Sequence, residues 1–220
     1  MIKNIFFDFD GTLVDTSEGI VNAMHYAFDK YALRRMPDEN IKAVIGPPLA
    51  EMFEILWQTK DEDKIADGVR LFREYYSKQG VFENKLYDGV LELLKKLSGN
   101  GFMLYVVSSK PAVFIEQIFS RYNIGGFFSG TTAVDCGVRT LSKAERMKNL
   151  LAERKISVNN AVMVGDRAED VLAAKANGVR SIGVTYGFGS AESLLGAGAW
   201  KLADMPCRIA RFVAEDNCEF

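Results

Sequence analysis

Two aspartates, Asp8 and Asp10, stand one residue apart where a short apolar run of the sequence ends. Carboxylates beside apolar residues are costly to desolvate, so a cation or hydrogen-bond donors are expected next to them. Side chains alternate along a strand, so both acids can face one crevice only if the chain bends at Asp10 and Gly11. The pattern predicts a cation site at the end of a buried strand, where one of the two carboxylates can act as a nucleophile.

A second acidic cluster, GDRAED at residues 165–170, follows another apolar run. Carboxylate oxygens suit Mg²⁺, which takes one or two of them together with water and a substrate phosphate. The alternative is that the acids begin a helix and interact with its dipole. That alternative is favoured for Glu169, and both interpretations stay open for Asp166 and Asp170.

Two further residues could bind phosphate. Ser108, in the run VVSSKP at residues 106–111, offers a hydroxyl close to a helix start, although such a serine is also an ordinary helix cap. Lys143 stands where a helix begins and where the dipole disfavours a cation. A nearby phosphate would explain this lysine, and a solvated surface position is the alternative.

Apolar runs predict strands, and residues with helical spacing lie between them. The strands are expected at 4–9, 102–107, 161–164 and 181–184, and the helices at 88–97, 111–122, 142–154 and 169–177. Alternating strands and helices predict a parallel α/β sheet covered on both faces. The four clusters follow in order along these elements, and the carboxyl ends of parallel strands share one edge, so they should line one crevice.

Residues 15–82 carry apolar and aromatic residues at helical intervals and predict an all-helical insert. The catalytic α/β core is then expected at 1–14 and 83–220. Within the insert, Gly46, Pro47 and Pro48 cannot continue a helix. They form either a rigid loop over the crevice that contributes to substrate specificity or a plain interhelical turn.

Composition excludes several classes of protein. The 220 residues carry a net charge of −2 without a basic face, so a nucleic acid polymer is not expected as a partner. There is no signal peptide or membrane-length apolar stretch, which predicts a cytoplasmic protein without a membrane partner, as a monomer or homodimer. The scattered Cys136, Cys207 and Cys218 argue against disulfides or zinc. The lone His25, expected to pack or lie on the surface, allows no serine or cysteine triad.

Taken together, DFDGTLVDT, VVSSK, Lys143 and GDRAED resemble the four motifs of the haloacid dehalogenase superfamily, in its phosphoglycolate phosphatase-like branch. The resemblance covers essentially the whole chain and implies a Rossmann-like core with an inserted helical cap domain. Segments 75–87, 160–166 and 186–190 also resemble a subgroup of 5′-nucleotidases.

The resemblance implies a role for each matching residue. Asp8 would be the nucleophile and Asp10 the general acid/base, while Ser108 and Lys143 hold the phosphoryl oxygens. Mg²⁺ would be bound by Asp8, the backbone carbonyl of Asp10 and Asp166, with Asp170 in the same shell or just behind it. The expected enzyme is a magnesium-dependent phosphatase that hydrolyses a small phosphomonoester through an aspartyl-phosphate, either phosphoglycolate or, as the alternative, a nucleoside monophosphate.

The same superfamily contains other activities, so the fold does not fix the reaction. A departing ester oxygen needs a proton, which the second acid Asp10 can supply, and this disfavours a dehalogenase. A phosphonatase ranks low because the lysines of the insert stand in charged contexts. A sugar phosphomutase and a catalytically silent regulatory protein remain as alternatives, although Asp8, Asp10, Lys143 and Asp166 are all present.

Overall fold

The computed structural model describes residues 1–134 and 141–218. The chain forms two compact units, one of residues 1–14 and 86–220 and the other of residues 15–85. Cys207 is an exposed free cysteine, whereas Cys136 and the side chain of Cys218 lie outside the described part. Among the described helices, none combines the length and the apolar character that a membrane crossing requires.

The larger unit contains a six-stranded sheet in the order β5-β4-β1-β6-β7-β8, and every neighbouring pair is parallel. The strands are β1 (Asn4–Phe7), β4 (Met103–Pro111), β5 (Phe128–Val134), β6 (Ala161–Gly165), β7 (Arg180–Val184) and β8 (Lys201–Ala203). The predicted α/β fold is therefore confirmed. The two edge strands were not predicted, because β5 is poor in large apolar residues and β8 has three residues.

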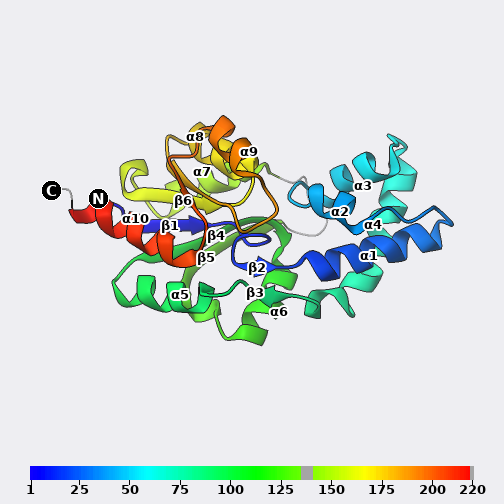
Figure 1. The fold of residues 1–220 in the computed structure, drawn as a ribbon, viewed down its shortest axis with the longest axis horizontal. Helices are drawn as coiled ribbons and strands as arrows, with labels where there is room; N and C mark the ends of the chain where they lie inside the picture. Colours follow the sequence, from blue (N-terminus) through cyan, green and yellow to red (C-terminus); the bar gives the residue numbers. More distant parts are fainter. Residues whose placement is uncertain (135–140, 219–220) are drawn as a thin grey trace. The chain divides into compact units, whose positions relative to one another are not determined.

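Helices cover both faces of this sheet (Figure 1), with α7, α8 and α9 on one side and α5 and α6 on the other. Their bounds are α5 (Val90–Gly99), α6 (Ala112–Tyr122), α7 (Lys143–Glu153), α8 (Ala168–Ala176), α9 (Ala191–Ala197) and α10 (Pro206–Cys218). Short 3-10 helices occur at η2 (Gly125–Phe127) and η3 (Val158–Asn160). Helix α10 packs against α5.

Side chains along each strand point alternately to the two faces of the sheet, so buried apolar residues lie on both faces. Phe6 stacks on Tyr105 at a centroid separation of 5.1 Å, and both belong to a cluster with Met147, Leu151 and Met163. Buried strands with apolar side chains on both faces are typical of a parallel sheet, and they fix the register on which the site depends.

The central strand β1 lies between β4 and β6, and Phe7 is in register with both Val106 and Val164. One residue further on, the backbone N–H of Asp8 donates to the carbonyl of Val164 at 2.8 Å. The residues that follow these three strands therefore emerge along one edge of the sheet, as the sequence predicts.

The second unit contains α1 (Ser17–Lys30), α2 (Asp38–Ala43), α3 (Leu49–Trp57), α4 (Glu62–Tyr76) and η1 (Gly80–Phe82). The short strands β2 (Val14–Asp15) and β3 (Lys85–Leu86) form a two-stranded sheet. Aromatic contacts build the interior of the unit, where Trp57 packs against Phe28, Tyr31 and Phe53. His25 contacts Asp38 at 2.8 Å. Gly46, Pro47 and Pro48 lie between α2 and α3, with Pro48 as the N-cap of α3.

Candidate active site

A tight turn after β1 separates Asp8 from Asp10. Gly11 has a φ of 81°, and the N–H groups of Leu13 and Val14 both donate to the carbonyl of Phe9. A side chain at Gly11 would place its Cβ 2.3 Å from Oδ2 of Asp166, which is too close for any contact between unbonded atoms. The bend predicted at Asp10 and Gly11 is present, and it lets Asp166 approach the turn.

Three buried carboxylates meet at this edge of the sheet. Oxygen atoms of Asp8, Asp166 and Asp170 all lie within 4.8 Å of one another. Asp8 is 4% exposed, and the other two are fully buried. Asp166 follows β6 directly, while Asp170 lies in the first turn of α8. Glu169 occupies the same turn outside this trio, in agreement with the helix-dipole interpretation.

Lys143 is the buried cation that contacts this trio. It is the first residue of α7, whose start is fixed by a capping box between Ser142 and Glu145. Its Nζ lies 3.1 Å from Oδ1 of Asp8 and 2.6 Å from Oδ1 of Asp170, and its side chain is 3% exposed. The surface-lysine interpretation of Lys143 is therefore wrong, because the side chain is buried against Asp8 and Asp170.

Burial and mutual repulsion shift the pKa values of these groups. Burial is the largest cause of the raised pKa of Asp8; the charge of Lys143 lowers this pKa, and the charges of Asp170, Asp166 and Asp10 raise it further. Burial and Asp170 likewise raise the pKa of Asp166 to about 6. Burial opposes the charge of Lys143, but Asp170 and Asp8 raise its pKa above the usual value. The trio thus carries more negative charge than Lys143 balances.

A loop after β7 braces Asp166. The N–H of Phe188 donates to Oδ2 of Asp166 at 2.8 Å, and the hydroxyl of Thr12 donates to Oδ1 at 3.2 Å. The hydroxyl of Tyr186 in turn donates to the carbonyl of Thr12 at 3.1 Å. None of these three residues was predicted to belong to the site, although the glycines at 187 and 189 indicate a close backbone approach.

Ser108 and Lys110 lie at the far end of β4, which continues to Pro111 and is longer than predicted. The N–H of Lys110 donates to Oγ of Ser108 at 3.2 Å, and Ser108 is 1% exposed. Ser108 does not cap a helix, because Pro111 is the N-cap of α6. Lys110 also reaches Asp10, with Nζ 2.9 Å from Oδ1. No sequence motif indicated a role for Lys110.

Arg146, one turn after Lys143, is a third buried cation, which the sequence motifs do not indicate. It is 4% exposed, and its guanidinium donates to the hydroxyl of Ser109 at 3.0 Å and to the carbonyl of Leu141. Ser109 follows Ser108 in β4, so this contact ties α7 to the strand that carries Ser108.

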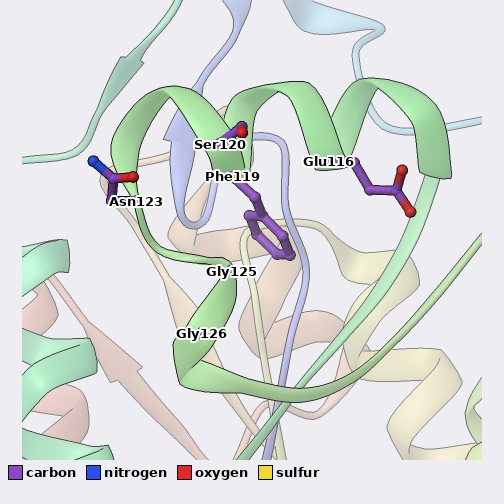
Figure 2. A pocket seen from close by; sticks show the side chains of 6 residues that line it. All are labelled: Glu116, Phe119, Ser120, Asn123, Gly125 and Gly126. Atoms are coloured by element: carbon purple, nitrogen blue, oxygen red, sulfur yellow. The ribbon is translucent and has the colours of Figure 1, made fainter.

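A separate surface hollow of about 390 Å³ lies at the C-terminal end of α6 and along η2 (Figure 2). Its lining residues are Glu116, Phe119, Ser120, Asn123, Gly125 and Gly126. None of the residues that the sequence proposed for chemistry lines it. Helix α6 begins at the carboxyl end of β4, so its opposite end leads away from Asp8 and toward the start of β5.

A fold of this topology with acids at the carboxyl edge of β1 and β6 defines a class of α/β hydrolases, and comparison with known proteins agrees. The family model described as "Haloacid dehalogenase-like hydrolase" matches residues 5–184. The chain therefore belongs to the haloacid dehalogenase-like hydrolase family, and it is an enzyme of the phosphatase class within that family.

Individual relatives cover nearly the whole chain. A protein of Pseudomonas aeruginosa named 5′-nucleotidase is 36% identical over 191 residues, or 87% of this chain and 86% of its own length. A phosphoglycolate phosphatase of Vibrio parahaemolyticus is 28% identical over 221 residues, 97% and 96% of the two chains. The crystal structure of a predicted phosphatase from Clostridium acetobutylicum has a TM-score of 0.92 at 33% identity and covers 98% and 99%.

Proposed function

We propose that this protein is a magnesium-dependent phosphatase that hydrolyses a small phosphomonoester through an aspartyl-phosphate formed on Asp8. The observation that carries the proposal is the position of Asp8 beside both a buried cation and two buried carboxylates. Its carboxylate contacts the ammonium of Lys143 at 3.1 Å and shares the buried trio with Asp166 and Asp170. A carboxylate is a competent nucleophile toward phosphate only where such positive charge is concentrated.

The donor set of the trio fits Mg²⁺. Carboxylate oxygens are hard ligands, and the three buried acids carry a surplus of negative charge that Lys143 does not balance. Asp8, Asp166 and the backbone carbonyl of Asp10 would hold the cation, with Asp170 beside them or just behind. When bound, the ion would neutralise charge on the phosphate and on the acids.

Four side chains would perform the reaction. An oxygen of Asp8 attacks phosphorus while the bond from phosphorus to the alcohol oxygen breaks, and the carboxyl proton of Asp10 passes to that oxygen. Ser108 and Lys143 bind the phosphoryl oxygens. Water then attacks phosphorus in the aspartyl-phosphate, Asp10 accepts its proton, and Asp8 and inorganic phosphate are released. Each step needs one proton transfer. Asp10 donates the proton in the first step and accepts one in the second.

The unit of residues 15–85 is proposed to be the cap that selects the substrate, with Gly46, Pro47 and Pro48 as its specificity loop. Two substrate classes have support. A nucleoside monophosphate is favoured by the 36% identity to the Pseudomonas aeruginosa protein named 5′-nucleotidase, and phosphoglycolate by the 28% identity to the Vibrio parahaemolyticus enzyme. Both are small phosphomonoesters that the same core chemistry would hydrolyse.

Hydrolysis of p-nitrophenyl phosphate with Mg²⁺ and with EDTA tests the reaction. We expect turnover in Mg²⁺, its loss in EDTA, and no turnover by Asp8→Asn, while the exposed Asp88→Asn keeps wild-type rates. Wild-type turnover by Asp8→Asn would contradict the mechanism. Comparison of kcat/KM for phosphoglycolate, nucleoside 5′-monophosphates and sugar phosphates then ranks the substrates, and dependence on a sugar bisphosphate would reveal a mutase.

A further inference from the structure

The proposed reaction leaves one buried ion pair at the sheet edge without a role. Nζ of Lys110 lies 2.9 Å from Oδ1 of Asp10, and the two side chains are 5% and 17% exposed. Removing an ammonium and a carboxylate from water costs several kcal/mol for each ion, so such pairs rarely add much stability. Their value is more often geometric, because a buried pair fixes the position of both groups.

The backbone of β4 delivers Lys110 to this position. Ser108 and Lys110 are two residues apart near the end of β4, where the pairing with β5 is irregular between Val107 and Pro111. The N–H of Lys110 donates to Oγ of Ser108 at 3.2 Å, which couples the two residues locally. The ammonium also lies 6.0 Å from the ring centroid of Phe9, on the turn that carries Asp10. A strand therefore holds Lys110, whereas Asp10 belongs to a turn.

The two buried lysines at this sheet edge contact different acids. Lys143 contacts Asp8 and Asp170, the proposed nucleophile and its neighbour, and Lys110 contacts Asp10. A general acid must lie within hydrogen-bond reach of the atom that it protonates, and a misplacement of about 1 Å can cost a factor of 10² in rate. The side chain of Asp10 is 17% exposed and that of Asp8 is 6% exposed, so Asp10 is the more accessible of the two acids.

We propose that Lys110 is a positioning residue that orients the carboxyl group of Asp10 toward the leaving oxygen of the substrate. The inference rests on the proposed function, in which Asp10 is the general acid. Lys110 binds Oδ1, and Oδ2 carries the proton. As the bond from phosphorus to the ester oxygen breaks, its electron pair goes to that oxygen, which takes the proton from Oδ2 of Asp10. Lys110 itself exchanges no proton with the substrate.

The role predicts a dependence on the leaving group. Phenyl phosphate and p-nitrophenyl phosphate have the same ring, but p-nitrophenolate departs without a proton far more readily than phenolate. We expect Lys110→Met to lower kcat/KM for phenyl phosphate by about tenfold or more, and for p-nitrophenyl phosphate by about threefold or less. The ratio kcat/KM reports the formation of the aspartyl-phosphate, so hydrolysis of that species does not obscure the comparison.

Three further variants isolate the interaction. Asp10→Asn should likewise lose more kcat/KM with phenyl phosphate than with p-nitrophenyl phosphate. The double variant, which combines Lys110→Met and Asp10→Asn, should have a kcat/KM no lower than Asp10→Asn alone, because the two residues act as one unit. Lys110→Arg keeps a cation and should recover most of the activity. Lys95→Met, an exposed lysine of α5, serves as the matched control. Thermal unfolding of every variant checks the fold, and Lys110→Gln replaces Lys110→Met if the latter does not fold.

Two results would overturn the inference. One is an equal loss of kcat/KM on both substrates in Lys110→Met. The other is a double variant whose kcat/KM lies below that of Asp10→Asn by the same factor that separates Lys110→Met from the wild type. A wild-type protein that hydrolyses neither substrate would instead overturn the proposed function, and the inference with it. The wild-type rates therefore test the function, and the ratios between variants test the role of Lys110.

Discussion

Nζ of Lys143 lies 3.1 Å from Oδ1 of Asp8, although the two residues are far apart in the sequence. The contact joins the first residue of α7 to the first residue after β1. It gives the proposed nucleophile a permanent cation, in addition to any metal that the trio binds. The consequences of this arrangement can be measured one residue at a time.

Replacing Lys143 by methionine should lower kcat/KM for phosphomonoesters by about 10²-fold or more, because the phosphoryl oxygens and Asp8 lose a preorganised positive charge. Steady-state kinetics in saturating Mg²⁺ measure the loss. Lys148→Met, an exposed lysine of the same helix, should stay within about twofold of the wild type. A Lys143→Met enzyme of near-wild-type activity would contradict the assignment of this residue.

Mg²⁺ should stabilise the folded protein, because the trio exists only in the native state. The gain is about 2.7 kcal/mol when the free ion is at 100 times its Kd. Differential scanning calorimetry in EDTA and in Mg²⁺ measures it as a rise in Tm. Asp166→Asn should lose most of this rise, whereas Asp88→Asn should keep it. A rise of equal size in Asp166→Asn would exclude this aspartate as a ligand.

Gly187→Ala should disturb the site without removing any functional group. A Cβ at this position would lie 2.2 Å from the carbonyl oxygen of Gly11 and 2.4 Å from Cβ of Asp166. The loop would have to move, and the bond from Phe188 to Asp166 would lengthen. We expect a loss of about 1–3 kcal/mol in stability together with weaker Mg²⁺ binding.

Gly196→Ala is the matched control, because apart from its chain neighbours and the nearby backbone of its own helix no atom lies within 4 Å of the added Cβ. Its unfolding free energy should not fall and should rise by about 0.5–1 kcal/mol, because alanine is a better helix former than glycine in α9. If Gly187→Ala unfolded at the wild-type temperature and bound Mg²⁺ normally, the loop would not be braced against Asp166 as described.

The pair Arg180 and Asp216 should make stability depend on pH at the acid end. Two hydrogen bonds from Arg180, at 2.6 and 2.9 Å, hold the pKa of Asp216 below its usual value. A lowered carboxyl pKa stabilises the fold above the unfolded value near pH 4, and this stabilisation disappears as the pH falls through the folded pKa.

Asp216→Asn should therefore unfold more easily than the wild type by about 1 kcal/mol at pH 7, a modest value because Arg180 is 39% exposed. The difference should shrink below about pH 4. Urea titrations of both proteins at pH 7 and pH 3.5 measure it. A difference that grew on acidification would have the wrong sign for this pair.

Local signals were sufficient for most of the larger unit. Apolar runs and helical spacing predicted the strands β1, β4, β6 and β7 and the helices α5, α6, α7 and α8, with ends that differ by a few residues, but not α9 or α10. They missed β5, whose sequence FSGTTAV carries few large apolar residues, and the three-residue β8. Edge strands are buried less completely, so their sequences carry less of the pattern that identifies a strand.

The sequence by itself determined the types of functional group and the sheet edge to which they belong. Asp8 and Asp166 follow β1 and β6, and Ser108 lies near the end of β4; the parallel pairing of these strands can be inferred from alternating strands and helices. Only the tertiary structure decided which charges meet. The contacts of Lys143 with Asp8, of Lys110 with Asp10 and of Phe188 with Asp166 join residues distant in the chain. Each depends on strand register and side-chain direction, which packing of the whole core fixes and local periodicity does not encode.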